Sequence, residues 1–560
     1  MKNFLKILAF LFITSAFFIS CDGIINNNGN QNSGTNTGGG NQNEADSGNS
    51  GSSSGTTETS SSSVEFVKKM GLGWNLGNTL DATADAGKSN QDNKTETSWG
   101  MPATTQEMIK SVHAAGFNTI RIPVSWHNHI ESVSGSTYKI DSNWMARVKE
   151  IVDWAIAEKM YVIINIHHDN MSQSSIENDT TYGYALSKTS SVKEKSKKWL
   201  SSIWTQIATE FSSYGESLIF EVLNEPRDIG GEVGGNEWWT TDSSLVSVIT
   251  DYEKTCIKAI RSVKGNENRY IMVPGYAASG SDSSLLKLYK MPEDSAKNKL
   301  ILSAHAYSPF YFAMSDTKDT TFDSPDAEEL TKLFDYLKTN YIDKGIGVVM
   351  GEASASDKNN LSEREKWAKD YFTKATKIGI PVVLWDNMVT VSNGGKIDSG
   401  ECHGYFNRRS LKWYFPSLIK TMGTCVYGSD FEKTAKIEVD ELEEGELISS
   451  SLDGISWEIS TTINAISNAK KDSTITFTTT ECSKEVTGEK NIIQIFDKDW
   501  KSFGITGSIS GGNVNDKGFV ASSSNGSVVW TLSESDAEKI KNNGFIIQVY
   551  GIKVNSIKFK

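Results

Sequence analysis

Two glutamates, Glu225 and Glu352, stand at the ends of short apolar segments in the middle of the chain. A charged side chain in such a place is costly to remove from water unless it is paired or used for chemistry. A single glutamate at a strand end is more often a salt-bridge partner, but two of them among other polar groups favour a reactive site. Paired carboxylates are typical of glycosidic bond cleavage, in which one acid protonates the leaving oxygen and the other carboxylate attacks or assists at the anomeric carbon.

Other polar side chains end segments of the same kind. They are Asn75, Arg121, His167, His168, Asn224, His305, Trp385 and Asp386. Two carboxylates in one site must be held in different states. We expect Asn224 beside Glu225, and Arg121 near Glu352, to separate their environments.

Eight apolar or β-branched segments position these residues, and longer segments with helical periodicity lie between them. The predicted strands are 71–75, 118–123, 161–167, 218–225, 270–274, 301–305, 346–352 and 382–386. The predicted helices include 104–115, 141–158, 194–214, 329–338 and 363–378. Apolar strands alternating with helices indicate a parallel sheet covered on both faces. Eight such units within 64–428 predict an α/β fold, a (β/α)8 TIM barrel, with its chemistry at the carboxyl ends of the strands.

A doubly wound open sheet is the alternative fold. The chain has no GxGxxG after the first predicted strand and no GxxxxGK[ST], so nucleotide binding has no support.

The segments around these residues resemble glycoside hydrolase family 5, the large cellulase family. Asn224-Glu225-Pro226, within IFEVLNEPR, is similar to the acid/base motif of that family. Other similar segments follow the same order and spacing: GWNLGNTLDA (73–82), ETSWGMPATT (96–105), GFNTIRIPVSWHNH (116–129), MYVIINIHHD (160–169), HAYSPF (305–310), VVMGEAS (348–354) and VVLWDN (382–387). They cover nearly all of 64–427 and resemble the endoglucanase and xyloglucanase branch.

The resemblance implies a retaining mechanism with Glu225 as general acid/base and Glu352 as nucleophile. It implies that Arg121 steadies the nucleophile and lowers its pKa by opposite charge. It also implies that Asn224 hydrogen-bonds the sugar 2-hydroxyl.

The same resemblance places His167, His305 and Tyr307 around the cleavage subsite, with the Tyr307 hydroxyl directed toward the nucleophile. It places Trp385 under the sugar at the point of cleavage. Asn75 and His168 are further supporting candidates, and a structural role for His168 and His127 is the alternative.

Aromatic residues in loops at the predicted barrel mouth are candidate sugar platforms. They are Trp99, Trp126, His129, Trp238 and Trp239. Tryptophans on predicted helices are expected to pack the barrel shell instead: Trp144, Trp154, Trp199, Trp204 and Trp367.

The 560-residue chain is 38% hydrophobic and 22% charged, with a formal net charge of −13. This balance, without any Lys/Arg run, argues against nucleic acid as a partner. No Cys/His spacing suits zinc, so we expect no metal and no cofactor. Cys402 and Cys425 are candidates for a disulfide in an oxidising compartment.

The N-terminus has the pattern of an export signal. Lys2 and Lys6 precede the apolar stretch 7–19, and Ser20-Cys21 resembles a lipoprotein cleavage site. We expect a signal peptide over 1–20, lipidation of Cys21, and a flexible Asn/Gly/Ser/Thr linker over 21–63. An ordinary signal peptide with an incidental cysteine is the alternative. The protein is then either a membrane-anchored lipoprotein facing the periplasm or cell surface, or secreted.

Residues 429–560 contain short alternating segments split by turn residues, which predicts an antiparallel β-sandwich. Attached to a glycanase, it resembles a carbohydrate-binding module. Trp457, Trp500 and Trp530 are candidates for stacking on glycan, and a structural sandwich with these rings in its core is the alternative.

Together these features predict a monomeric, endo-acting, retaining β-1,4-glucanase whose partner is a β-glucan polysaccharide. The preferred polymer stays open among cellulose-type glucan, xyloglucan, mixed-linkage glucan and mannan. A surface glycan-binding lipoprotein with an inactive barrel is the alternative from another functional class, and the intact glutamate pair argues against it.

Overall fold

The computed structural model describes residues 62–84, 87–315, 319–393, 395–438, 447–448, 451–457, 459–463, 465–466 and 468–560. The predicted signal peptide, Cys21 and the predicted linker up to residue 61 lie outside the described residues. Helix α1 (Ser63–Val67) begins at the last predicted linker residue, and the Ser62 hydroxyl caps it by accepting from the Glu65 backbone N–H. Within the described residues, no helix combines the length and apolar character needed to cross a bilayer.

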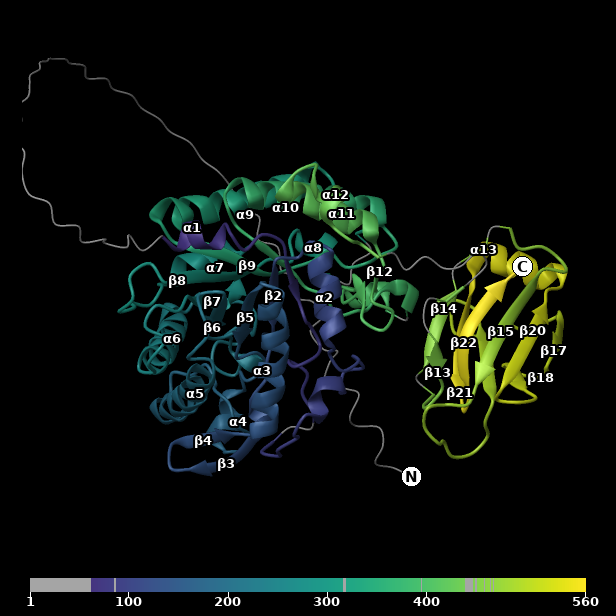
Figure 1. Ribbon diagram of the computed structural model, residues 1–560, viewed down its shortest axis with the longest axis horizontal. Helices are drawn as coiled ribbons and strands as arrows, with labels where there is room; N and C mark the ends of the chain where they lie inside the picture. The colour runs from purple at the N-terminus through teal and green to yellow at the C-terminus, as the bar shows by residue number, and fades with distance from the viewer. Residues whose placement is uncertain are drawn as a thin grey trace, which may run out of the picture. The chain divides into compact units, whose positions relative to one another are not determined.

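Eight parallel strands close into a barrel in the order β1-β10-β9-β8-β7-β6-β5-β2. Figure 1 labels β2 and β5 to β9 of this barrel. They are β1 (Gly73–Asn75), β2 (Thr119–Ile122), β5 (Tyr161–Asn165), β6 (Leu218–Glu221), β7 (Ile271–Ser279), β8 (Leu300–His305), β9 (Gly347–Ala353) and β10 (Val382–Leu384). All eight predicted strands are present, and the (β/α)8 barrel is confirmed. The fourth strand ends at Glu221, so Glu225 lies in the following loop rather than in the strand as predicted.

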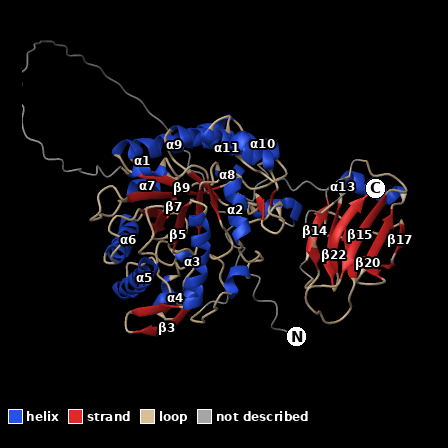
Figure 2. Ribbon diagram, viewed as in Figure 1, coloured by secondary structure: helices blue, strands red, loops and turns tan. Residues whose placement is uncertain are grey.

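Helices surround the barrel between consecutive strands (Figure 2). They are α2 (Gln106–Ala114), α3 (Ser142–Ala157), α5 (Ser190–Glu210), α6 (Ser243–Arg261), α7 (Ser283–Leu288), α9 (Ser324–Asn340), α10 (Leu361–Lys377) and, after the last strand, α11 (Pro416–Tyr427). Shorter elements in the loops are α4 (Gln173–Glu177), α8 (Phe310–Ala313), α12 (Phe431–Thr434) and the strand pairs β3 (Ile130–Ser134) with β4 (Thr137–Ile140) and β11 (Phe406–Asn407) with β12 (Lys412–Trp413). The five predicted helices all form, with small shifts at their ends.

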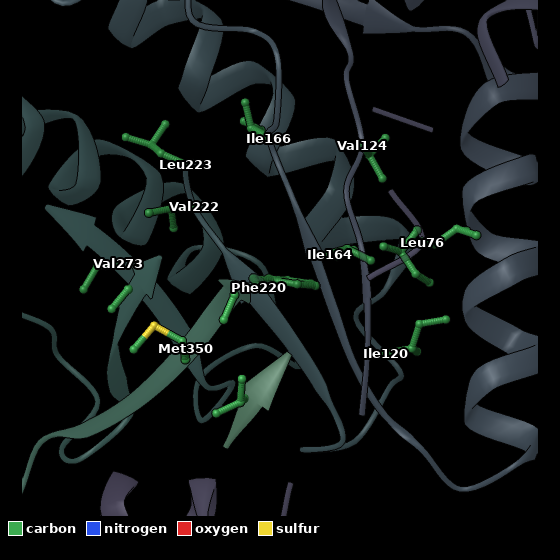
Figure 3. Packing of buried hydrophobic residues seen from close by; sticks show 14 of the residues in the cluster. Leu76, Ile120, Val124, Ile164, Ile166, Phe220, Val222, Leu223, Val273 and Met350 are labelled. Carbon is green, nitrogen blue, oxygen red and sulfur yellow. The ribbon is translucent and has the colours of Figure 1, made fainter. Parts of the chain in front are cut away.

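Alternate residues of each strand face the helices and the barrel interior, because successive side chains point to opposite sides of a sheet. The helix-facing residues form one large apolar layer, part of which Figure 3 shows around Ile164, Phe220 and Met350. At the amino-terminal end of the interior lies a separate apolar layer that includes Phe66 and Val67 of α1. Its strand residues are Ile163, Ile219, Met272, Ile301, Val349 and Val383.

Two residues further along the strands, the interior becomes polar. This second layer contains Asn75, Arg121, Asn165, Glu221 and Ser303, all of them buried. The apolar layer below therefore supports a polar layer directly beneath the carboxyl-terminal mouth of the barrel.

A bulge in β9 turns one more residue inward. Ala304 of β8 pairs with Met350, but the next residue, His305, pairs with Glu352, so Gly351 is the extra residue. A bulge re-aims the side chains that follow it. A Cβ on Gly351 would lie 3.1 Å from His305 Nε2, which indicates that glycine here leaves room for the imidazole.

The C-terminal part forms two five-stranded antiparallel sheets around their own core. One sheet has the order β13-β22-β15-β20-β17 and the other the order β14-β21-β16-β19-β18. The first contains β13 (Leu452–Asp453), β22 (Lys553–Phe559), β15 (Thr474–Thr480), β20 (Gly526–Thr531) and β17 (Ser508–Ser510). The second contains β14 (Ser460–Ile463), β21 (Phe545–Tyr550), β16 (Ile492–Phe496), β19 (Gly518–Ala521) and β18 (Gly512–Asn515), and α13 (Glu534–Asn543) precedes β21.

The structure decides two questions that the sequence left open. Cys402 and Cys425 do not pair, since both carry free thiols, as do Cys256 and Cys482. Trp530 is fully buried in the C-terminal core, where its indole N–H donates to Asp536 Oδ2 at 3.1 Å, so it is not available to a glycan.

Candidate active site

Arg121 on β2 is the centre of a buried hydrogen-bond network at the barrel mouth. Its guanidinium donates to Glu352 Oε1 at 2.7 Å, Asn75 Oδ1 at 2.9 Å and Asn224 Oδ1 at 2.6 Å. It also donates from Nε to Glu221 Oε2 at 2.8 Å. The planar donor fork of arginine fixes several partners at once, which a lysine could not do. Arg121 on β2 thus joins residues of three other barrel strands, β1, β6 and β9, and of the loop after β6.

Glu352 is held by donors at both carboxylate oxygens. Arg121 contacts Oε1, and the Tyr307 hydroxyl donates to Oε2 at 2.8 Å. Burial and the charge of Glu352 raise the pKa of Tyr307 well above its ordinary value, so its O–H stays a donor. A carboxylate with donors at both oxygens is fixed in orientation.

Glu225 lies within reach of Glu352. His305 bridges them: its Nδ1 is 2.8 Å from Glu225 Oε1 and 3.7 Å from Glu352 Oε2. One oxygen of Glu225 and one of Glu352 lie within 4.8 Å of each other. Arg227 Nη1 lies 3.6 Å from the other oxygen of Glu225. The two carboxylates that the sequence suggested as a pair are thus brought together.

The charges around His305 decide where a proton resides. Burial alone would lower the pKa of His305, but the charge of Glu352 and the contacts with Glu221 and Glu225 raise it to about 9. Burial alone would raise the pKa of Glu225, but the hydrogen bond with His305 and the positive charge of His305 lower it. At neutral pH the Glu225–His305 pair therefore holds a proton, shared along a 2.8 Å hydrogen bond.

Glu221 is a third buried carboxylate that the sequence prediction missed. Besides Arg121, it accepts from Asn165 Nδ2 at 2.9 Å and from the Ser303 hydroxyl, and its Oε1 lies 3.8 Å from His305 Nε2. Burial alone would raise the pKa of Glu221, but the charges of Arg121 and His305 and the Ser303 hydrogen bond lower it to about 2. The alternation Ile219-x-Glu221, parallel to Ile301-x-Ser303-x-His305, is a signal that could have placed it inside the barrel.

His167, His168 and Trp385 lie on another side of the mouth. The His167 and Trp385 rings are parallel with centroids 6.0 Å apart, and the His167 and His168 rings meet edge to face at 4.4 Å. Burial lowers the pKa of His167 well below its ordinary value. The side chain of His168 is 38% exposed, and its partial burial together with the charge of Arg227 lowers its pKa to about 4. Both imidazoles are therefore neutral near pH 7. His168 Nε2 is 4.0 Å from Asp81 Oδ2, and its ring lies 5.5 Å from that of Trp99.

The candidate platforms at the mouth separate into two groups. Trp99, Trp238 and Trp239 are 40%, 51% and 45% exposed. Trp126 is fully buried, with its indole N–H donating to Asn165 O at 2.9 Å, and His129 is buried against Trp144 at 3.7 Å. Trp126 and His129 are therefore excluded from the candidate sugar platforms, because both belong to the barrel shell.

Two groups of described residues have the spacing of metal ligands: Asp81 with His167 and His168, and Glu225 with His305 and Glu352. In the second group a protonated His305 has no free lone pair for a cation. In the first, Asp81 already accepts from the backbone N–H groups of Asn78 and Thr79. In both groups, atoms that could bind a metal ion are thus already used in hydrogen bonds within the protein or carry a proton.

Comparison with known proteins places this geometry in a family. Residues 83–390 match the family model of cellulase (glycosyl hydrolase family 5). Over 368 residues the chain is 41% identical to Endoglucanase 1 of Ruminococcus albus, covering 65% of this chain and 81% of that protein. It is also 41% identical to Endoglucanase A of Clostridium longisporum, over 64% of each chain.

Solved structures agree. A GH5-4 broad specificity endoglucanase from Ruminococcus champanellensis with bound cellotriose is 37% identical, with a TM-score of 0.58 over 65% of this chain and 98% of that one. A mutant lichenase of family 5 from Caldicellulosiruptor sp. F32, in complex with cellotetraose, is 37% identical, with a TM-score of 0.57 over 65% and 95% of the two chains. The barrel, its polar interior layer and these similarities together establish that this chain belongs to the cellulase family, glycosyl hydrolase family 5.

Proposed function

We propose that this protein is an endo-acting β-1,4-glucanase that hydrolyses its substrate with retention of anomeric configuration. The observation that carries the proposal is the proximity of Glu225 and Glu352, whose nearest ligand oxygens lie within 4.8 Å. Retaining glycosidases place their carboxyl groups about 5–5.5 Å apart, whereas inverting enzymes need about 6.5–9.5 Å to admit a water between them.

In the first step, a Glu352 oxygen attacks the anomeric carbon and the glycosidic bond breaks. Arg121 and Tyr307 orient the attacking carboxylate from its two sides. The proton that Glu225 and His305 share moves through Glu225 to the leaving oxygen, which leaves Glu225 as a carboxylate and His305 neutral. A covalent glycosyl-enzyme forms, and one sugar chain leaves with a new hydroxyl group.

In the second step, Glu225 removes a proton from water, whose oxygen attacks the anomeric carbon and releases Glu352. Two displacements at one carbon restore the original configuration. The four carboxylates of Glu221, Glu225, Glu237 and Glu352 outnumber the three positive charges of Arg121, Arg227 and a protonated His305, which leaves one net negative charge. This balance favours a transition state in which positive charge develops on the sugar.

A β-glucan chain fits the residues at the mouth. Trp385, which is 8% exposed and lies beside His167, and the exposed Trp99, Trp238 and Trp239 are the candidate stacking surfaces for successive sugar rings. Relatives named endoglucanase, a neighbour described as having broad specificity and another described as a lichenase support β-1,4-glucan and mixed-linkage glucan as substrates. Initial rates on cellulose-type glucan, mixed-linkage glucan, xyloglucan and mannan, measured side by side, rank these polymers.

Substitution of the two glutamates tests the mechanism. We expect Glu225→Gln and Glu352→Gln each to lower kcat on soluble β-glucan by at least about 10³-fold, because each removes a group that acts on the reacting bond. Glu253→Gln is a matched control, since Glu253 is a buried carboxyl on α6 that accepts from Tyr289. Wild-type rates in either mutant would contradict the proposal. Polymer binding by the unmodified protein without release of reducing ends would instead support the glycan-binding lipoprotein.

We further propose export and anchoring through a lipid on Cys21, with a polymeric substrate outside the cytoplasm, and a monomeric protein. The proposed export and anchoring rest on the N-terminal sequence, and secretion without an anchor is the alternative. Metabolic labelling with a radioactive fatty acid tests it: the full chain should be labelled, and a Cys21→Ala variant should not. Labelling that persists in the variant contradicts the proposed site.

A further inference from the structure

The outer face of the sheet β14-β21-β16-β19-β18 carries an ordered arrangement of side chains. Ile493, Ile495, Ile547 and Val549 point into the C-terminal core, so the residues between them point outward. Strand pairing aligns these outward residues in rows across the sheet. Figure 1 shows β14 and β21 at one side of this part of the molecule.

The central row is polar and uncharged. Ser460 pairs with Gln548, Gln548 with Gln494, Gln494 with Gly518, and Gly518 with Asn515. Side-chain amides carry both donors and acceptors, which matches the hydroxyl groups of a sugar. A row without charge does not suit nucleic acid or another anionic polymer.

An aromatic pair flanks this row on one side. Trp457 stacks on Tyr550, the outward residue two positions beyond Gln548, with ring centroids 4.4 Å apart and planes within 3°. The pair is fixed in place, because the Tyr550 hydroxyl donates to Thr487 O at 2.9 Å and the Gln548 amide donates to Trp457 O. Trp457 remains 43% exposed, so one of its faces is open.

A second aromatic pair flanks the row on the other side. Phe496 lies two positions beyond Gln494 on β16, and the Trp500 ring lies 5.4 Å from it. Trp500 is 49% exposed and has a φ of 60°, a conformation that is unfavourable for a bulky side chain. Strain of this kind is retained mainly where the position of a side chain matters for function.

The two aromatic pairs are separated by a fixed span. From Tyr550 to Ile546, which pairs with Phe496, β21 advances four residues, or about 14 Å at ~3.4 Å per residue. The span separates the strand positions beside which the two exposed indoles lie, and the Gln494 and Gln548 amides lie between these positions.

We propose that this outer face is a second glycan-binding site, which takes a single chain of neutral polysaccharide. Sugar rings stack on Trp457 and Trp500, and their hydroxyl groups bond to Gln494 and Gln548. The identification of this chain as β-glucan rests on the proposed function of the barrel. Two sites on one protein raise its residence on a polymer, because the second binding event becomes intramolecular.

The experiment is native gel electrophoresis of the full chain through gels containing hydroxyethyl cellulose, mixed-linkage glucan or xyloglucan. All proteins carry Glu352→Gln, so that the polymer is not degraded during the run. The parent should be retarded, and addition of Trp457→Ala and Trp500→Ala should raise the dissociation constant at least about tenfold. The control, Thr476→Ala with Val529→Ala on the outer face of the opposite sheet, should migrate like the parent.

A parent that is not retarded by any of the three polymers, or a double tryptophan variant that is retarded as strongly as the parent, overturns the proposal. Trp457→Ala and Trp500→Ala are also tested singly, since both side chains are about half exposed and their removal leaves the core intact. Hydrolysis by the unmodified protein is measured separately. The unmodified protein could fail to hydrolyse the polymers while the gels still show retardation that depends on the two tryptophans. That result would refute the proposed function of the barrel and support this second site.

Discussion

Replacement of Glu221 by glutamine removes a buried charge while keeping the size of the side chain. Glu221 contacts Arg121, Asn165 and Ser303 and faces His305, but it does not reach the position of the reacting bond defined by Glu225 and Glu352. The glutamine amide would present N–H groups to neighbours that are themselves donors. We therefore expect the positions of Arg121 and His305 to shift and the proton affinity of His305 to fall.

The size of the effect follows from the 3.8 Å between His305 Nε2 and Glu221 Oε1. Two unit charges at this distance attract by about 1 kcal/mol in bulk water and about 4 kcal/mol at an effective dielectric constant of 20. Loss of this attraction lowers the pKa of His305 from about 9 by roughly 0.7–3 units. Breaking a buried ion pair from one side also costs about 3 kcal/mol of folding stability.

The assay is the pH dependence of kcat/KM on a soluble β-glucan. In the unmodified protein the alkaline limb should lie near pH 9, where the Glu225–His305 pair loses its proton. In Glu221→Gln this limb should move to lower pH, and kcat should fall about 100-fold because the reacting groups are misplaced. Glu221→Asp keeps the negative charge, so its alkaline limb should lie closer to pH 9 than that of Glu221→Gln.

Glu253→Gln serves as the control, because burial raises the pKa of Glu253 well above its ordinary value and its carboxyl is already neutral. It should leave the pH profile unchanged. An alkaline limb in Glu221→Gln that coincides with that of the unmodified protein would refute the assigned positioning role.

The raised pKa of His305 also predicts a pH dependence of stability. The contribution of protonated His305 to the free energy of unfolding is fully present below about pH 6.5 and is lost as pH rises through about 9.

Three further substitutions test other parts of the site. Tyr307→Phe removes the donor to Glu352 Oε2 and should lower kcat about tenfold with little change in KM; an unchanged kcat would show that Arg121 alone orients the nucleophile. Gly77→Ala would place a Cβ 3.0 Å from the Trp385 ring and 2.8 Å from Asp386 O, so we expect a higher KM for short cello-oligosaccharides, and an unaltered KM would argue against Trp385 as a sugar platform. Trp126→Ala should lower the free energy of unfolding by about 3–5 kcal/mol in a urea titration, as expected for a fully buried indole, and a purely kinetic effect would contradict its place in the barrel shell.

Local sequence determined the secondary structure of the barrel and most of the residues at its mouth. Short apolar or β-branched runs between helical segments located the eight strands, and polar residues at or just after strand ends pointed to Arg121, His305 and Glu352. Strand ends are visible in sequence because parallel strands are buried on both faces, so a polar residue interrupts an apolar run. For this reason the candidate site could be assembled before its geometry was known.

Burial of aromatic rings was decided by the tertiary structure. Trp126 and Trp238 both lie in loops after strands, yet one is fully buried and the other is 51% exposed. In the C-terminal sheets, Trp530 and Trp500 differ in the same way. An indole suits either environment, and only the packing of distant segments determines which one it occupies.

The orientation of the two most important interior carboxylates also required the fold. Glu352 faces His305 because Gly351 adds one residue to β9 relative to its neighbour β8, a register change that depends on strand pairing. Glu221 was hidden within an apolar run, since only barrel closure brings Arg121, Asn165 and Ser303 around it. The sequence by itself thus determined which residue types stand at which strand ends, because that information is local. The tertiary structure decided which charges meet inside the barrel, because those meetings join strands up to 231 residues apart in the chain.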